Sequence, residues 1–173
     1  DSNALAADPV IESKYQKYRS AFPELTQIVG QNESRLNRKY FDESSLANLI
    51  TDITVEMTKA QIGLINSGGI RKDLPQGAVE IVDILDALPF IDPIVVVQMT
   101  GAQLKAIMEQ GFTLLRGLMQ VSGIEVTYDL SKPEGKRVLS IMHEGTEVKA
   151  DDVFEVATGN FLANGGDHYS TFT

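Results

Sequence analysis

A short apolar run that ends at a polar, glycine-containing segment most constrains how this chain can fold. Ile62-Gly63-Leu64-Ile65 is short enough to be a buried strand, and Asn66-Ser67-Gly68-Gly69-Ile70-Arg71 follows it directly. Because Gly68 and Gly69 lack a Cβ, the backbone there can adopt positive φ or approach a ligand closely. Arg71 adds a permanent charge whose planar donors suit phosphate or carboxylate. The sequence thus predicts a strand leading into a candidate anion site, although an ordinary turn with a solvated arginine has the same pattern.

Hydrophobic periodicity predicts a succession of helices and strands along the chain. Asp8 is expected to cap a first helix that begins at Pro9, and Thr100 to cap a later helix that Gly111 closes. The helices are expected at residues 9–22, 43–59, 82–88 and 101–111. The strands are expected at residues 26–30, 61–65, 94–99, 118–129, 137–143 and 153–158, with a hairpin-like turn at 131–135. This mixture predicts an α+β fold, a single domain with a mixed β-sheet core and flanking helices.

Composition and charge exclude several classes of partner. The chain has 173 residues, the size of one domain, and a formal net charge of −9, with 24 acidic and 15 basic residues. Nucleic acid is therefore not expected as a partner because it needs a basic face, whereas a small phosphorylated ligand needs only one or two local cations. The chain has no cysteine, which excludes disulfides and thiolate chemistry. No apolar run approaches the roughly 18 residues of a membrane span.

The first residues are expected to lie outside the natural domain. Ser2-Asn3-Ala4 is typical of what remains after a purification tag is cleaved, so residues 1–4 are interpreted as a tag remnant and residues 5–173 as the domain. The start of the chain has no signal-peptide pattern. If the chain is an engineered fragment, that absence says nothing about localisation.

Two further segments place chemically useful side chains at the ends of predicted elements. Leu88-Pro89-Phe90 leaves an aromatic ring where a helix stops, and Asn160 to Asp167 follows the last predicted strand. Phe90 and Phe161 are suited to stacking on either side of a base, each worth about 1–3 kcal/mol, and the carboxylate of Asp167 is suited to accepting from sugar hydroxyls. Together with the cation and the amide of the first segment, this set matches a nucleotide.

Simpler interpretations exist for each of these residues taken singly. A phenylalanine at the end of a strand is more often part of the core than of a binding site. Asp167 is suited to capping the glycine turn before it, and Asn66 to closing an Asx turn. The histidines, His143 and His168, have no partner at metal-ligand spacing, so no metal site is expected in this chain. No nucleophile, general base, P-loop or dinucleotide-binding motif is evident either.

Five motifs in a fixed order resemble the C-terminal domain of the 5′-nucleotidase family over about residues 25–173. The motifs are Asn66-Ser-Gly-Gly-Ile-Arg71, Gly77…Asp83-Ile-Leu…Leu88-Pro89-Phe90, Met99-Thr100-Gly101…Leu104, Ser122-Gly123 and Asn160-Phe-Leu-Ala-Asn-Gly-Gly-Asp167. The resemblance implies the substrate-recognition domain of a phosphohydrolase. In that family an N-terminal metallophosphoesterase domain holds a pair of divalent metal ions and a catalytic Asp–His pair, and a rotation between the domains delivers the substrate phosphate to the metals.

The resemblance also implies a role for each residue of the candidate site. Phe90 and Phe161 are expected to sandwich the base, Asp167 to bind the ribose hydroxyls and Arg71 to contact phosphate. Asn66 is expected to help at the sugar or the phosphate, and the backbone of Gly68 and Gly69 to lie against the ligand. The expected partners are a nucleotide or nucleoside and the chain's own N-terminal domain. The fragment alone is expected to be non-catalytic, with its parent enzyme extracellular, periplasmic or at the cell surface.

Two positions depart from the family pattern. Tyr40 lies three residues before Glu43, where family members often have an arginine, and His168 stands where they commonly have glycine. One arginine fewer weakens the expected grip on a monophosphate, since each charge-assisted contact contributes about 1.5–3 kcal/mol. A 2′,3′-cyclic nucleotide, a UDP-sugar or a diphosphate therefore stays open as the substrate. A structural or protein-interaction module that has lost its ligand stays open as the alternative function.

Overall fold

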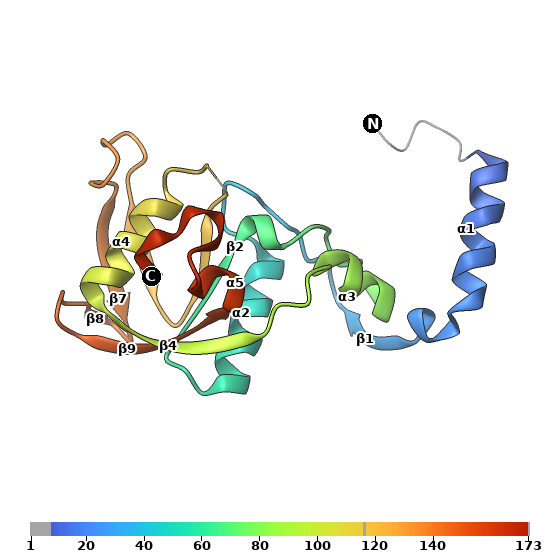
Figure 1. Ribbon diagram of the computed structural model, residues 1–173, viewed down its shortest axis with the longest axis horizontal. Coiled ribbons are helices and arrows are strands. Elements are labelled where there is room, and N and C mark those ends of the chain that lie inside the picture. Colours follow the sequence, from blue (N-terminus) through green and yellow to red (C-terminus); the bar gives the residue numbers. More distant parts are fainter. Residues whose placement is uncertain (1–7, 116, 173) are drawn as a thin grey trace.

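A four-stranded sheet lies at the centre of the computed structural model, which describes residues 8–115 and 117–172 (Figure 1). In spatial order its strands are β4 (Ile94–Thr100), β9 (Val153–Gly159), β2 (Ile62–Asn66) and β5 (Met119–Ser122). β9 runs antiparallel to β4 but parallel to β2, and β2 runs antiparallel to β5, so the sheet is mixed. The strands predicted at 61–65, 94–99 and 153–158 are confirmed to within one residue.

Two amphipathic helices pack against this sheet, and both begin at the caps that their sequences provide. α2 (Ser45–Thr58) begins after Ser44, whose Oγ accepts from the Ala47 N–H at 3.1 Å. α4 (Gly101–Gly111) begins after Thr100, which forms a capping box with Gln103. The main core lies between α4 and the sheet, and its most deeply buried members are Ile62, Leu104, Ile107 and Val156. The helices predicted at 43–59 and 101–111 are therefore confirmed.

The strand predicted over residues 118–129 is wrong as a single element, because the chain changes sheets at Gly123. β5 ends at Ser122 in the central sheet, whereas β6 (Glu125–Tyr128) pairs with β7 (Val138–His143) in a second sheet that β8 (Thr146–Glu147) completes. Gly123 adopts φ +82°, and a Cβ there would overlap the carbonyl oxygen of Gln61. The predicted turn between β6 and β7 is confirmed, but the short β8 has no counterpart among the predictions.

A smaller unit projects from the body of the domain. It comprises α1 (Pro9–Ala21), the 3₁₀ turn η2 (Pro23–Thr26), β1 (Ile28–Asn32), β3 (Gly77–Glu80) and α3 (Ile81–Ala87), with β1 antiparallel to β3. A second apolar cluster, which includes Leu46 of α2, Val79 of β3 and Ala87 of α3, joins these elements. The strand predicted at 26–30 lies two residues further on, and β3 was not predicted, because its partner in β1 is distant in sequence.

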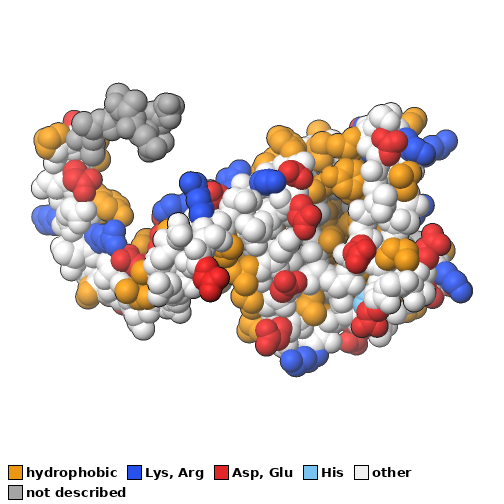
Figure 2. Space-filling model, turned by 180° about the vertical axis from the view of Figure 1, so that it is seen from behind, with side chains coloured by type: hydrophobic (Ala, Val, Ile, Leu, Met, Phe, Trp, Pro, Cys, Tyr) orange, Lys and Arg blue, Asp and Glu red, His pale blue; other side chains and the backbone are white. Residues whose placement is uncertain are grey.

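α1 stands apart from the rest of the molecule, with its apolar side chains exposed (Figures 1 and 2). Asp8 caps it as predicted, since the Asp8 Oδ1 accepts from the Val10 N–H at 2.8 Å. An ion pair between Arg19 and Glu80 joins its last turn to the end of β3. None of the helices in the described part of the chain has both the length and the hydrophobicity of a membrane span.

The parallel pair β2 and β9 determines where distant segments meet. Because parallel strands end at the same edge of a sheet, the segments that follow them lie next to each other. η3 (Ser67–Gly69) follows β2, and α5 (Asn160–Ala163) follows β9 and leads into η4 (Gly166–His168) and η5 (Ser170–Phe172). The first and last motifs of the sequence are thereby brought together.

Candidate functional site

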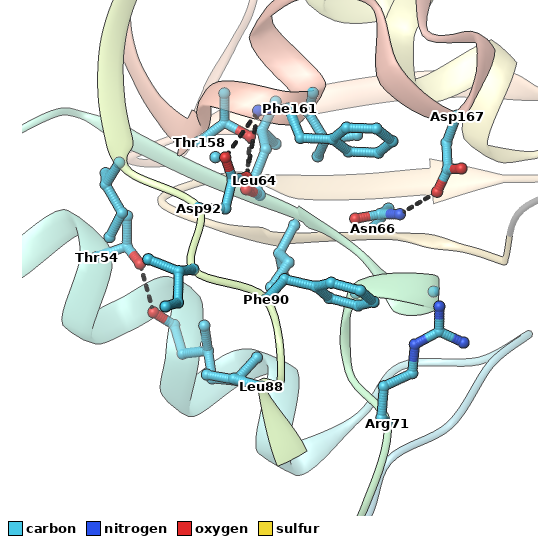
Figure 3. Close-up of a pocket in the computed structure, with 18 residues that line it drawn as sticks. Thr54, Leu64, Asn66, Arg71, Leu88, Phe90, Asp92, Thr158, Phe161 and Asp167 are labelled. Carbon is cyan, nitrogen blue, oxygen red and sulfur yellow. Dashed lines mark hydrogen bonds between the residues drawn. The ribbon is translucent and has the colours of Figure 1, made fainter. Parts of the chain in front are cut away.

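A cavity of about 580 Å³ opens where β2 and β9 end (Figure 3). All seven residues predicted for the site line it, namely Asn66, Gly68, Gly69, Arg71, Phe90, Phe161 and Asp167. They come from three separate stretches of sequence: the end of β2 with η3, the loop after α3, and α5 with η4. The cavity is further walled by apolar side chains of α2, β2 and β4.

The two phenylalanines at the cavity are surface residues rather than core residues. Phe90 is 57% exposed and Phe161 is 52% exposed, so the interpretation of these rings as core is wrong. Pro89 follows α3 and prevents the helix from continuing, which leaves Phe90 in the loop beyond it. Figure 3 shows the rings lying on opposite sides of the open space, with Phe161 carried by α5. Exposed apolar rings that face a shared space are suited to binding a flat apolar group.

Phe161 is held at both its ring and its backbone. A Cβ on Gly166 would lie 2.5–2.6 Å from three carbon atoms of the Phe161 ring, so only glycine allows the turn to approach the ring this closely. The backbone N–H of Phe161 donates to the carboxylate of Asp92, with N–O distances of 3.0 and 3.2 Å. The position of this ring is therefore set by specific contacts, even though one side of it is open to the cavity.

Asn66 and Asp167 form the polar part of the cavity wall. Asn66 is 5% exposed, and its Nδ2 donates to Asp167 Oδ2 at 2.5 Å (Figure 3). Its side chain makes no capping bond to η3, so the Asx-turn interpretation is wrong. Asp167 and His168 both adopt left-handed backbone conformations, with φ of +51° and +68°. The second value explains why a glycine suits position 168, because glycine adopts this conformation without steric penalty.

Tyr169, buried behind this turn, stays a neutral phenol. Its side chain is in the main core, and burial raises its pKa well above the usual value, with the nearby negative charge of Asp167 acting in the same direction. The turn that carries Asp167 is therefore backed by an apolar, uncharged ring.

Arg71 is a cation that lines the cavity. It follows η3, its backbone N–H donates to the Ala87 carbonyl at 2.8 Å, and its Cζ lies 5.2 Å from the centroid of the Phe90 ring. Within the described part of the chain, no carboxylate forms an ion pair with Arg71. Other cations of this region are paired, in Arg35–Asp73, Lys39–Asp42 and Lys72–Asp86 at 2.7, 2.8 and 2.9 Å. The hydrogen bond to Asp86 also raises the pKa of Lys72. Lys72 therefore stays positively charged, and the carboxylate of Asp86 offsets that charge.

The neighbourhood of Tyr40 holds a second arginine. Arg38 Nη1 donates to the backbone carbonyl of Arg71 at 3.0 Å, and its Cζ lies 5.8 Å from the centroid of the Tyr40 ring. Arg38 does not line the cavity itself, but its contact with the Arg71 carbonyl steadies the segment that carries Arg71. Tyr40 in turn supports this region through its carbonyl, which accepts from the Leu118 N–H at 2.8 Å.

The two glycines of the first motif are not required by an unusual backbone conformation, and at Gly69 the structure shows close packing instead. Neither Gly68 nor Gly69 has a positive φ. A Cβ on Gly69 would lie 3.1 Å from the Asn66 Oδ1, tighter than ordinary van der Waals contact. A side chain at position 69 would therefore press on the amide that orients Asp167.

Several residues of the wall were not anticipated from the sequence. Asp92 lines the cavity two residues after Phe90, and only its place in the same loop could have pointed to it. Thr54 and Thr158 also line it, but their hydroxyls donate to the Ile50 and Leu64 carbonyls at 2.8 and 3.0 Å. Among the described residues, no group of three or more His, Cys, Asp or Glu side chains is arranged to hold a metal ion.

Comparison with known proteins gives the same assignment over nearly the whole chain. The family described as "5′-nucleotidase, C-terminal domain" matches residues 24–173. The trifunctional nucleotide phosphoesterase protein YfkN of Bacillus subtilis is 35% identical over 144 residues, covering 76% of this chain and 10% of that protein. A snake venom 5′-nucleotidase of Naja atra is 27% identical over 199 residues, covering 97% of this chain and 38% of that protein.

A solved structure agrees with this assignment. The crystal structure of a 5′-nucleotidase precursor from Thermus thermophilus superposes with a TM-score of 0.90 at 29% sequence identity, covering 99% of this chain and 37% of that chain. The chain thus spans well under half the length of these relatives. The fold predicted from the sequence is confirmed by this superposition.

Proposed function

The chain belongs to the 5′-nucleotidase family as its C-terminal domain, and from that membership we propose that it recognises the nucleoside and phosphate of a nucleotide substrate. Its relatives are hydrolases of nucleotides, and the chain corresponds to one domain of such enzymes. The observation that carries the proposal is the convergence of two exposed rings, an oriented carboxylate and an arginine on one cavity. These groups suit the base, the ribose and the phosphate.

The base is proposed to lie between Phe90 and Phe161. Both rings are more than half exposed without a ligand, at 57% and 52%. Stacking on aromatic rings contributes about 1–3 kcal/mol per base and is tolerant of base identity. A ligand-free structural module has no reason to keep two such rings facing an open cavity, which favours the binding function over that alternative.

The ribose is proposed to bind at Asp167. An ionised carboxylate only accepts hydrogen bonds, and each of two neighbouring ribose hydroxyls can donate one to it. Asn66 donates to Asp167 Oδ2 and so fixes the carboxylate, and Asn66 Oδ1 faces Gly69. The backbone of Gly68 and Gly69 is proposed to lie against the ligand on this side.

The phosphate is proposed to contact Arg71, and a matched pair of ligands tests this. Arg71→Ala should weaken AMP binding by about 1.5–3 kcal/mol, the worth of a charge-assisted hydrogen bond, and leave adenosine binding nearly unchanged. Isothermal titration calorimetry with both ligands measures the difference. Arg35→Ala removes the same charge from an arginine paired to Asp73 outside the cavity and serves as the control. Equal losses for AMP and adenosine would contradict a phosphate contact.

Hydrolysis is proposed to need a further domain. The described residues present no candidate metal cluster, so no step of metal chemistry is assigned to them. From the family membership we propose that residues 5–173 act with an N-terminal metallophosphoesterase domain, whose pair of divalent metals carries out the reaction. Residues 1–4, interpreted as a tag remnant, lie outside the residues that the structure describes.

The family membership also bears on localisation. The parent enzyme is proposed to be extracellular, periplasmic or at the cell surface, as the venom relative's name indicates for that protein.

Titration of four ligands into the folded chain tests the proposed function. Adenosine, AMP, UMP and UDP-glucose differ in base, charge and the group beyond the phosphate, so their ranking separates monophosphates from UDP-sugars. Adding a 2′,3′-cyclic nucleotide and ADP tests the other open substrates. We expect saturable binding, at millimolar or lower concentrations, that Phe90→Ala and Phe161→Ala both weaken. If none of these ligands binds while the circular dichroism spectrum is that of a folded protein, the proposal is wrong for this domain.

A further inference from the structure

The two rings of the cavity belong to segments that are far apart in sequence, so some contact must set their separation. The loop after Phe90 leads directly into β4, and the last residue of β9 leads directly into α5. β4 and β9 are paired up to this point, with Ile94 opposite Gly159. One residue further on, the Asn160 N–H donates to the Pro93 carbonyl at 2.8 Å. The strand pairing thus brings the two ring-bearing segments side by side.

Asp92 extends this connection beyond the strands to the ring-bearing residue itself. Its Oδ1 and Oδ2 both accept from the Phe161 N–H, at 3.0 and 3.2 Å (Figure 3). Asp92 lies only two residues after Phe90. A single carboxylate therefore ties the backbone of one ring-bearing residue to the loop of the other.

Gly159 provides the space that this carboxylate occupies. A Cβ on Gly159 would overlap Asp92 Oδ2, and its three nearest atoms beyond the adjacent residues would all be carboxyl atoms of Asp92. Any side chain at position 159 would thus push the carboxylate away from the Phe161 N–H. The contact between the Asp92 carboxylate and the Phe161 N–H therefore depends on the absence of a side chain at Gly159.

We propose that Asp92, accommodated by Gly159, is a positioning residue that holds Phe161 at the distance from Phe90 that a planar base requires. The inference rests on the proposed function, because it concerns how the same cavity selects ligands with an aromatic base. Gly166 restrains the Phe161 ring from its other side, so loss of the Asp92 contact frees the backbone of α5 rather than the whole turn. Asp92 acts through Phe161 and is not assigned a contact with the ligand.

A comparison of AMP with ribose 5-phosphate isolates this role. The two ligands share the phosphate and the sugar, and only AMP has a base to place between the rings. For Asp92→Ala we expect AMP affinity to fall about tenfold, as for loss of a hydrogen bond to a charged group, and ribose 5-phosphate affinity to stay within about twofold. Asp92→Asn keeps an oxygen acceptor for the Phe161 N–H and should restore most of the AMP affinity. Asp129→Ala, which removes a carboxylate that accepts from the Ser131 N–H in a remote turn, is the control.

A double-mutant cycle with Gly159 strengthens the test. Gly159→Ala alone should lower AMP affinity about as much as Asp92→Ala, because it displaces the same carboxylate. In the Asp92→Ala background it should have little further effect, because the atoms that the new Cβ would meet are gone. Additive losses would show that the two residues act independently and would overturn the proposal.

The remaining outcomes separate this inference from the proposed function. If the unaltered protein binds AMP no better than ribose 5-phosphate, the rings do not hold a base, and both the proposed function and this inference are wrong. If it prefers AMP but Asp92→Ala keeps that preference, only the positioning role is overturned. Equal loss of both ligands, or an Asp92→Asn variant as weak as Asp92→Ala, would overturn it as well.

Discussion

Phe161→Ala is expected to weaken AMP binding by about 1–3 kcal/mol, roughly a 5- to 150-fold rise in Kd, while leaving the fold intact. The ring is 52% exposed, packs against the Gly166 turn and belongs to neither apolar core cluster, so its removal exposes little core. The loss should be specific to ligands that carry a base, because the sugar and phosphate are proposed to bind elsewhere. Calorimetric titration with AMP measures the affinity, and a thermal melt measures the stability.

Phe22→Ala is the matched control for this variant. Phe22 is 50% exposed, almost the same as Phe161, but it follows α1 in the projecting unit and lies outside the cavity. We expect its AMP affinity to be unchanged. A large drop in melting temperature for Phe161→Ala with unchanged AMP binding would instead assign the ring a structural role. Phe90→Ala should mirror Phe161→Ala, since each ring is proposed to cover one face of the same base.

The sequence was most informative where one local signal decides the structure. The 3.6-residue period through Leu46, Ile50 and Ile53 predicts α2, and Thr100 marks the start of α4 because its hydroxyl and Gln103 form the capping box. The apolar run before Asn66 predicts β2 in the same way. Signals of this kind depend on residues that are close together in the sequence, so they can be recognised without knowledge of the rest of the fold.

The gathering of the site residues needed more than local signals. Nothing in the spacing of Arg71, Phe90 and Phe161 indicates that they share a cavity. Their residue types at the ends of elements suggested a nucleotide, and the resemblance to a family supplied the expectation of one site. Their convergence depends on the parallel pairing of β2 with β9, which is non-local. Which cation can bind a phosphate also depends on the tertiary structure. Lys72 is next to Arg71 in the sequence, but it forms an ion pair with Asp86 of α3.

Asp92 and Gly123 show why the rest was missed. The sequence gives Asp92 no distinguishing neighbour, since its partner is the backbone of Phe161. Gly123 interrupts what is otherwise a continuous β-rich stretch, and the Gln61 carbonyl that a Cβ there would overlap is brought beside it by the pairing of β5 with β2. Contacts of this kind are set by the fold and leave no local pattern.

Gly123→Ala is expected to destabilise the domain by about 3 kcal/mol or more, a large share of the roughly 5–15 kcal/mol typical of a domain. A left-handed conformation costs an alanine about 1–2 kcal/mol by itself, and Gly123 has φ +82°. In addition, the new Cβ would overlap the Gln61 carbonyl oxygen, which cannot move freely because the Gln61 N–H is bonded to the Glu155 carbonyl at 2.9 Å. Chemical denaturation with urea measures the change in the free energy of unfolding.

Gly135→Ala separates the overlap from the backbone conformation. Gly135 has nearly the same φ, +76°, but a Cβ there would meet nothing within 4 Å. We therefore expect Gly135→Ala to lower the free energy of unfolding by only about 1–2 kcal/mol, the cost of the left-handed conformation alone. If both variants lose the same amount, the close approach to Gln61 contributes nothing and positive φ alone explains the glycine. If Gly123→Ala loses much more, the switch between the two sheets depends on an approach of β5 to the start of β2 that only glycine allows. The paired stretch of β5 and β2 that begins beside this approach ends at Asn66 opposite Met119, and Asn66 is the residue that orients Asp167.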